Sequence, residues 1–188
     1  MDIVQKLAVD IARQTVPDEI YQAPLVAEIF VKGGKNRKEL LQQVKGGELG
    51  GFGTGEAAIL PWIFHAMALA TPFLTGFLAS RTVDNTSIIM REIRSALSAL
   101  NARKSTLPNQ VQPSQQQEPR AALSSPPQRQ LHNIPNQLQQ CVDEMAKALQ
   151  KAGLSVEESE RVAYKVIFVL WEDSPDAIVF LHKITEKK

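Results

Sequence analysis

A run of 24 residues without a formally charged side chain, residues 57–80, constrains this chain more than any other feature. A helix that spans the hydrocarbon core of a bilayer needs about 20 predominantly apolar residues, so the run is long enough to cross a membrane. Its composition is marginal, because two prolines, two threonines, a glycine and His65 dilute its apolar content. Two interpretations therefore stay open: a membrane segment, or a buried core of a soluble domain.

The membrane interpretation assigns lipid contact to seven large apolar side chains of this run. Trp62 near one end and Arg81 after the other resemble interfacial anchors. Pro72 is tolerable in a lipid-exposed helix, since neighbouring hydroxyl groups can satisfy backbone groups that a proline frees. The predicted lipid-contact residues are Trp62, Ile63, Phe64, Phe73, Leu74, Phe77 and Leu78.

The buried interpretation makes the same side chains the core of a helical domain. Pro72 would then mark a turn between two short helices, 61–70 and 73–80. Residues 3–11, 40–44 and 88–100 carry apolar side chains at helical spacing and could cover these helices. Both interpretations hold if the apolar segment is covered by these amphipathic helices in solution and can leave them to enter a bilayer.

Six of the ten glycines precede this run, within residues 46–55. Bare amides before a helix can hold a phosphate, but a P-loop requires Lys followed by Ser or Thr after its last glycine. Here Glu56 occupies that place, and its carboxylate would repel phosphate. We therefore predict a hinge made of Gly46, Gly47, Gly50, Gly51, Gly53 and Gly55.

Helix-start signals predict elements on both sides of the run. Asn36 with Glu39 has the spacing of a capping box, and residues 84–86 offer N-cap candidates for the helix that follows. Further on, Ser155 with Glu158 forms a second capping box, and Gly153 fits the C-cap of the preceding helix.

The chain divides by composition into three parts. Residues 1–103 read as a helical domain around the segment at 57–80. Residues 104–136 hold six of the eleven prolines and seven glutamines, which predicts a disordered linker. Residues 137–188 read as a small three-helix bundle, with Leu138, Val142, Met145 and Leu149 on one apolar face. A bundle of this size would gain stability by binding a protein partner or a second copy of the chain.

No arrangement of side chains predicts catalysis. The three histidines, His65, His132 and His182, show no metal-ligand spacing with one another or with Cys141, the single cysteine. Cys141 with His132 would be a nucleophile pair without a third orienting group. We expect no enzymatic activity, no cofactor and no metal. The formal net charge of +1, without a strongly basic block, also gives no reason to expect nucleic-acid binding.

The sequence thus predicts an all-α protein with an N-terminal helical domain, a linker and a small C-terminal bundle. The leading function is a non-enzymatic effector that associates with a lipid bilayer, or inserts into it conditionally, and contacts a protein partner through residues 137–188. The alternative is a soluble helical adaptor or scaffold, and a nucleotide-responsive protein is a weaker third. The interrupted apolar pattern of residues 1–10 predicts no signal peptide and therefore a cytoplasmic location, at or in the membrane under the leading function.

Overall fold

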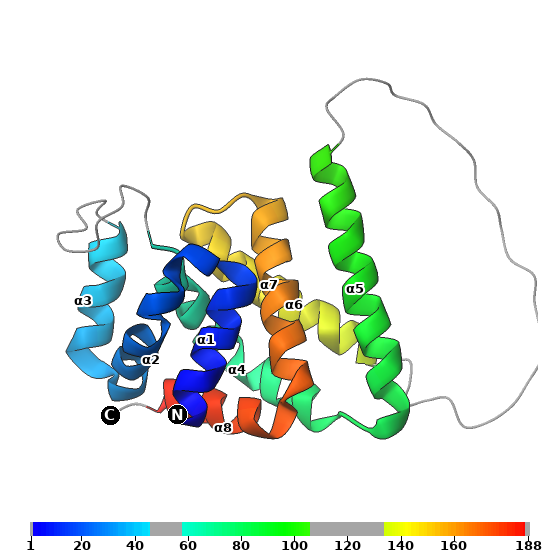
Figure 1. Ribbon diagram of the computed structural model, residues 1–188, viewed down its shortest axis with the longest axis horizontal. Helices are drawn as coiled ribbons and strands as arrows, with labels where there is room; N and C mark the ends of the chain where they lie inside the picture. The colour runs from blue at the N-terminus through cyan, green and yellow to red at the C-terminus, as the bar shows by residue number, and fades with distance from the viewer. Residues whose placement is uncertain (1, 46–57, 106–133, 187–188) are drawn as a thin grey trace, which may run out of the picture.

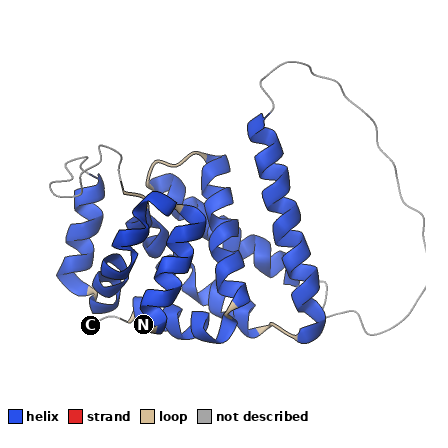
Figure 2. Cartoon of the chain, in the orientation of Figure 1, coloured by secondary structure: helices blue, strands red, loops and turns tan. Residues whose placement is uncertain are grey.

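The computed structural model describes residues 2–45, 58–105 and 134–186, and within these ranges the chain is helical without a strand (Figure 2). The all-α class predicted from the sequence is confirmed. The elements are α1 (Ile3–Thr15), the 3-10 helix η1 (Pro17–Gln22), α2 (Ala23–Lys32), α3 (Gly34–Lys45), α4 (Leu60–Ala79), α5 (Val83–Ser105), α6 (Ile134–Lys151), α7 (Val156–Glu172) and α8 (Ser174–Thr185).

Helix α4 lies at the centre of the fold, packed most extensively against α6 and also against α8, α2, α3 and α7. Three aromatic contacts fix it to its neighbours. Phe64 lies 5.5 Å from Phe30 of α2 and 5.7 Å from Phe180 of α8, measured between ring centroids. Near the other end of α4, Phe77 lies 4.6 Å from Trp171 of α7. Tilted and edge-to-face aromatic pairs of this kind add stability beyond the area that they bury.

Helix α4 is continuous, so the predicted turn at Pro72 is wrong. A proline inside a helix removes one backbone hydrogen bond, but the helix persists where packing outweighs that loss. Buried neighbours on both sides of Pro72, including Met67 and Leu74, hold α4 in the core. The hydroxyl of Thr71 donates to the carbonyl of Met67, and that of Thr75 to the carbonyl of Thr71.

The chain's two predicted folded parts share buried surface. One cluster of buried residues includes side chains from α1, α2, α4 and α5 together with side chains from α6, α7 and α8. The C-terminal helices therefore bury their apolar faces against α4 and α1 as well as against one another. The linker predicted at 104–136 lies outside the described residues except at its ends, where α5 continues to Ser105 and α6 begins at Ile134.

Helix α5 occupies one side of the molecule, alongside α7 (Figure 1). The buried side chains Ile89, Ile93 and Leu100 form its inner stripe. This is the stripe expected from the sequence, with Ile88 and Leu97 half-buried at its edges. Arg94 places its guanidinium 5.8 Å from the ring centroid of Phe168 on α7, which adds a cation–π contact to this packing.

The helix-start predictions had mixed outcomes. The capping box of Ser155 with Glu158 at the start of α7 is confirmed, and Gly153 after α6 has the positive φ of a C-cap glycine. The predicted capping box at Asn36 is wrong, since α3 already begins at Gly34 and Asn36 lies inside it. The positive φ angles of Gly33 and Gly34 let the chain turn directly from α2 into α3.

At the start of α5, the predicted N-cap candidates at 84–86 lie one residue or more inside the helix. The pair that caps α5 is Thr82 with Asn85. The backbone N–H of Thr82 donates to Oδ1 of Asn85 at 2.9 Å, and the N–H of Asn85 donates to Oγ1 of Thr82 at 3.4 Å. The helix therefore begins earlier than expected because Thr82 supplies a side-chain acceptor before it.

Candidate functional site

Helix α4 has one face in the core and one face toward the surface. Its core face is formed by eleven buried residues, among them Leu60, Ile63 and Leu74. Its outward face, the α4 stripe, consists of residues at helical spacing, none of which is Asp, Glu, Lys or Arg. The α4 stripe comprises Trp62, His65, Leu69, Pro72, Phe73 and Gly76.

Two large apolar side chains project from the α4 stripe. Leu69 is 54% exposed and Phe73 is 36% exposed, and they lie four residues apart on the same face. Trp62 and His65 are half-buried at one end of the stripe, with their rings in edge contact at 5.8 Å between centroids. The stripe is therefore an uncharged, partly apolar surface that follows much of a 20-residue helix.

The structure divides the seven predicted lipid-contact residues between the two faces of α4. Ile63, Phe64, Leu74, Phe77 and Leu78 are buried. Trp62 is half-buried, and only Phe73 is exposed. Sequence reasoning missed Leu69, the most exposed large apolar residue of the helix. The spacing from Trp62 through residue 69 to Phe73 would have placed it on the same face. The six predicted hinge glycines, at 46–55, lie outside the described residues.

A carboxylate from a distant part of the chain caps the N-terminus of α4. Glu19 in η1 accepts hydrogen bonds from the backbone N–H of Ile59 at 2.8 Å and from that of Leu60 at 2.9 Å. The first N–H groups of a helix have no intrahelical acceptor, and the helix dipole favours a negative charge there. Glu19 thus satisfies two backbone donors and attaches the start of α4 to the N-terminal region.

An arginine ties the other end of α4 to the junction of α7 and α8. Arg81 donates to the carbonyls of Trp171 at 2.6 Å and Glu172 at 3.1 Å, and to the hydroxyl of Ser174 at 3.1 Å. Its guanidinium also lies 5.8 Å from the ring centroid of Trp171. A cation at the C-terminus of a helix is favourable, because the last carbonyls have no intrahelical donors. Arg81 is therefore a structural contact in this fold, where the sequence had suggested an interfacial anchor.

His65 is the one titratable residue on the α4 stripe. Its Nδ1 is buried and has no hydrogen-bond partner among the described residues. Burial lowers the pKa of His65, and the positive charge of Arg37 on α3 lowers it further. Arg37 is itself half-buried, with its guanidinium 4.7 Å from the ring centroid of Phe30 and bonded to the carbonyl of Ile184 at 3.1 Å. The folded protein therefore favours a neutral imidazole at this position.

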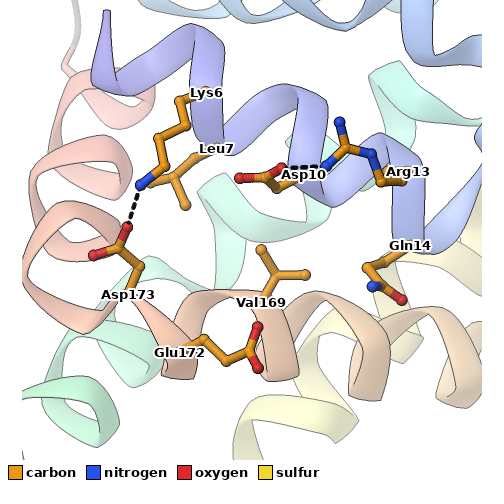
Figure 3. A pocket seen from close by; sticks show the side chains of 8 residues that line it. All are labelled: Lys6, Leu7, Asp10, Arg13, Gln14, Val169, Glu172 and Asp173. Carbon is orange, nitrogen blue, oxygen red and sulfur yellow. Dashed lines mark hydrogen bonds and ion pairs between the residues drawn. The ribbon is translucent and has the colours of Figure 1, made fainter.

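A polar pocket of about 400 Å³ lies between α1 and the end of α7 (Figure 3). Two ion pairs border it, Lys6 with Asp173 at 2.8 Å and Arg13 with Asp10 at 2.9 Å. Hydrogen bonding and the charge of Asp173 raise the pKa of Lys6. Because both cations already have carboxylate partners, this pocket offers no uncompensated positive charge for an anionic ligand. The Lys6–Asp173 pair instead joins α1 to the loop before α8.

The remaining candidates for reactive chemistry lie apart. Cys141 is buried in α6, and burial raises its pKa to about 12, so its thiol stays protonated. His182 is on the exposed side of α8, and His132 lies outside the described residues. Across residues 2–45, 58–105 and 134–186, no group of three or more His, Cys, Asp or Glu side chains is arranged to hold a metal ion.

By length and composition, α4 is the one described helix that could cross a membrane, with a mean hydropathy of 1.4 over its most apolar stretch. Half of that stretch is buried inside the fold, which fits both a membrane helix and the core helix of a soluble domain. In comparisons with protein-family models, with curated proteins and with solved structures, nothing matched this chain.

Proposed function

We propose that this protein is a non-enzymatic effector that docks on a lipid bilayer through the α4 stripe and inserts α4 conditionally. The observation that carries the proposal is the exposure of Leu69 and Phe73 on an uncharged face of a helix long enough to span hydrocarbon. Exposed apolar surface on a folded protein often marks an interaction site. Here the whole length of the helix, and not only its outward face, is compatible with lipid.

Helix α4 can exchange core contacts for lipid contacts without exposing its own apolar side chains to water. Side chains such as Ile63 and Leu74 lose protein neighbours on insertion but remain out of water. The backbone of a continuous helix keeps its own hydrogen bonds, as a bilayer requires. Trp62 and His65 lie in the first two turns of α4, where an amphipathic ring fits the bilayer interface.

The two end contacts of α4 make insertion conditional. Glu19 holds the start of the helix and Arg81 follows its end, and both contacts bridge elements that must separate before α4 can leave the core. Docking through the α4 stripe needs neither contact to break. The proposed sequence is therefore docking of the folded protein, followed by release of α4 under a trigger that weakens these contacts.

The second candidate function is a soluble helical adaptor or scaffold. Its support is the burial of five of the seven predicted lipid-contact residues, which is what a core helix requires. In that case the α4 stripe would bind a protein, and residues 137–188 would contribute a further contact with a partner or with a second copy.

Charge substitution on the two faces of α4 tests the proposal. Phe73→Asp and Leu69→Asp place a carboxylate on the exposed face, so we expect the folded state to persist and flotation with lipid vesicles to be lost. Leu74→Asp would bury an unpaired charge and serves as the unfolding control. Val156→Asp, which changes an exposed valine at the start of α7, is the matched control that should keep vesicle binding. Undiminished flotation of folded Leu69→Asp and Phe73→Asp proteins would favour the adaptor.

A further inference from the structure

Helix α3, which packs against α4, carries a group of basic side chains. Helix α3 packs against α2 and α4, and Arg37 on α3 is close enough to His65 to lower its pKa. The end of α2 and the first turns of α3 carry the basic side chains of this surface, which we call the α3 surface. They are Lys32, Lys35, Arg37 and Lys38.

The charges of the α3 surface are mostly accessible to water. The side chain of Lys35 is 86% exposed and reaches Glu39 at 3.4 Å, and that of Lys32 is 62% exposed and pairs with Glu28 at 2.6 Å. Lys38 is also exposed. Ion pairs in water between such mobile side chains are weak, and a polyanionic surface can compete for the ammonium groups. Four basic and two acidic side chains leave this corner positive in a chain whose net charge is only +1.

Arg37 anchors this basic helix to the elements that pack beside α4. Its guanidinium lies over the Phe30 ring and donates to the Ile184 carbonyl, so α3 is fixed to both α2 and the end of α8. The lysines at 35 and 38 are thus carried on an anchored helix. Their long aliphatic stems let the ammonium groups reach headgroups while apolar neighbours enter the interface.

We infer that the α3 surface and the α4 stripe together recognise a bilayer that contains anionic phospholipid. The inference rests on the proposed function and adds the lipid class to it. Helix α6, which is packed most extensively on α4, offers no such excess of positive charge, because the charges of Asp143 and Glu144 balance those of Lys147 and Lys151. Basic side chains beside a membrane attract acidic lipids over a distance of about one Debye length, about 10 Å at 0.1 M salt.

Vesicle partitioning of the full chain tests this inference. The probes are vesicles of phosphatidylcholine alone and of phosphatidylcholine mixed with phosphatidylserine, each at low and high salt. We expect tighter partitioning onto the serine-containing vesicles, weakened by salt. Lys38→Glu should reduce it by at least about fivefold, the factor that the loss of one basic residue near such a surface costs, and the added carboxylate weakens partitioning further. The reduction should be absent on phosphatidylcholine alone.

Two control variants separate site-specific binding from overall charge. Arg91→Glu changes an exposed cation on α5 by the same two charge units and should leave partitioning nearly unchanged. Lys38→Arg keeps the charge and should retain binding. Equal losses for Lys38→Glu and Arg91→Glu would overturn the inference, as would no loss for Lys38→Glu.

The outcomes also distinguish this inference from the proposed function. Equal binding to both vesicle types that is lost in Phe73→Asp would overturn the anionic-lipid inference and support docking through α4. Binding to serine-containing vesicles that Lys38→Glu weakens and Phe73→Asp does not would overturn docking through α4 and support the basic surface. No binding to either vesicle type, at any salt and at acidic or neutral pH, would overturn both.

Discussion

His65 couples the stability of the fold to pH. Its pKa is lowered in the folded state by burial and by Arg37, while an unfolded chain restores the ordinary value of about 6.5. Between these two values the unfolded state binds more protons, so folding stability falls as the pH drops below about 6.5 and this loss is complete below the folded-state pKa. Acid therefore lowers the free energy of unfolding through His65.

We predict that His65→Gln makes the free energy of unfolding less dependent on pH. Urea unfolding at about pH 7.5 and about pH 5.5 measures this dependence. Carboxylates contribute to it in both proteins, so the informative quantity is the difference between the variant and the wild type. His182→Gln, on the exposed side of α8, is the matched control. A wild-type pH dependence retained in full by His65→Gln would contradict the account.

Glu19 is a second residue whose role extends beyond its own element. Replacement by alanine leaves two backbone donors at the start of α4 without their acceptor. We predict a loss of about 1–2 kcal/mol in the free energy of unfolding, the usual cost of a lost helix cap. The neighbouring Asp18, an exposed carboxylate, supplies the control variant Asp18→Ala. Equal stability of the two variants would show that the cap contributes nothing.

At the scale of the element, much of α4 follows from its sequence and part of it does not. The run of residues without charged side chains predicts a helix that is shielded from water. The helical spacing of its large side chains indicates which face of that helix points outward. The partners at its ends could not be predicted, because Glu19 and Arg81 reach backbone groups 40 and 90 residues away along the chain. Pro72 misled the buried interpretation, since local propensity favours a break there and tertiary packing overrides it.

Gly76 provides a test of α4 as an element. It lies on the outward face, and a Cβ added there would meet nothing within 4 Å. Gly76→Ala should therefore stabilise the protein by about 0.5–1 kcal/mol, because alanine loses less backbone entropy in a helix than glycine does. Gly153→Ala is the contrasting variant and should destabilise, because Gly153 has φ +102°. Thermal unfolding of both proteins checks the two signs, and a destabilised Gly76→Ala protein would mean that this face is covered.

At the scale of the whole molecule, the shared core has a consequence for fragments. Helices α6 and α8 cover α4, so a chain ending at Ser105 would leave residues such as Phe64 and Met67 facing water. We predict that residues 1–105 alone bind a hydrophobic dye and unfold without cooperativity, and that co-expression with residues 134–188 restores a soluble complex. Cooperative unfolding of the isolated 1–105 fragment as a monomer would contradict this prediction and support two independent domains.

The sequence patterns alone divide the chain into two folded parts and a linker, because they do not indicate that the two parts share buried surface. Amphipathic faces in 137–188 predict three helices but do not specify what those faces cover. In the structure these faces pack on α4, although residues 106–133 separate them from it along the chain. The long-range packing that buries α4 is thus the property that the proposed membrane function must reverse.

Site-specific labelling of the α4 stripe tests the central claim, that α4 faces a bilayer, most directly. Leu69→Cys provides an exposed thiol for an environment-sensitive fluorophore, while buried Cys141, with its pKa raised to about 12, should remain unlabelled. On addition of serine-containing vesicles we predict a blue-shifted emission that brominated lipid quenches, and no change for a fluorophore at Arg91→Cys on α5. An aqueous, unquenched fluorophore at position 69 on vesicle-bound protein would contradict the account. Failure of both the wild-type protein and the labelled protein to bind the vesicles would also contradict it.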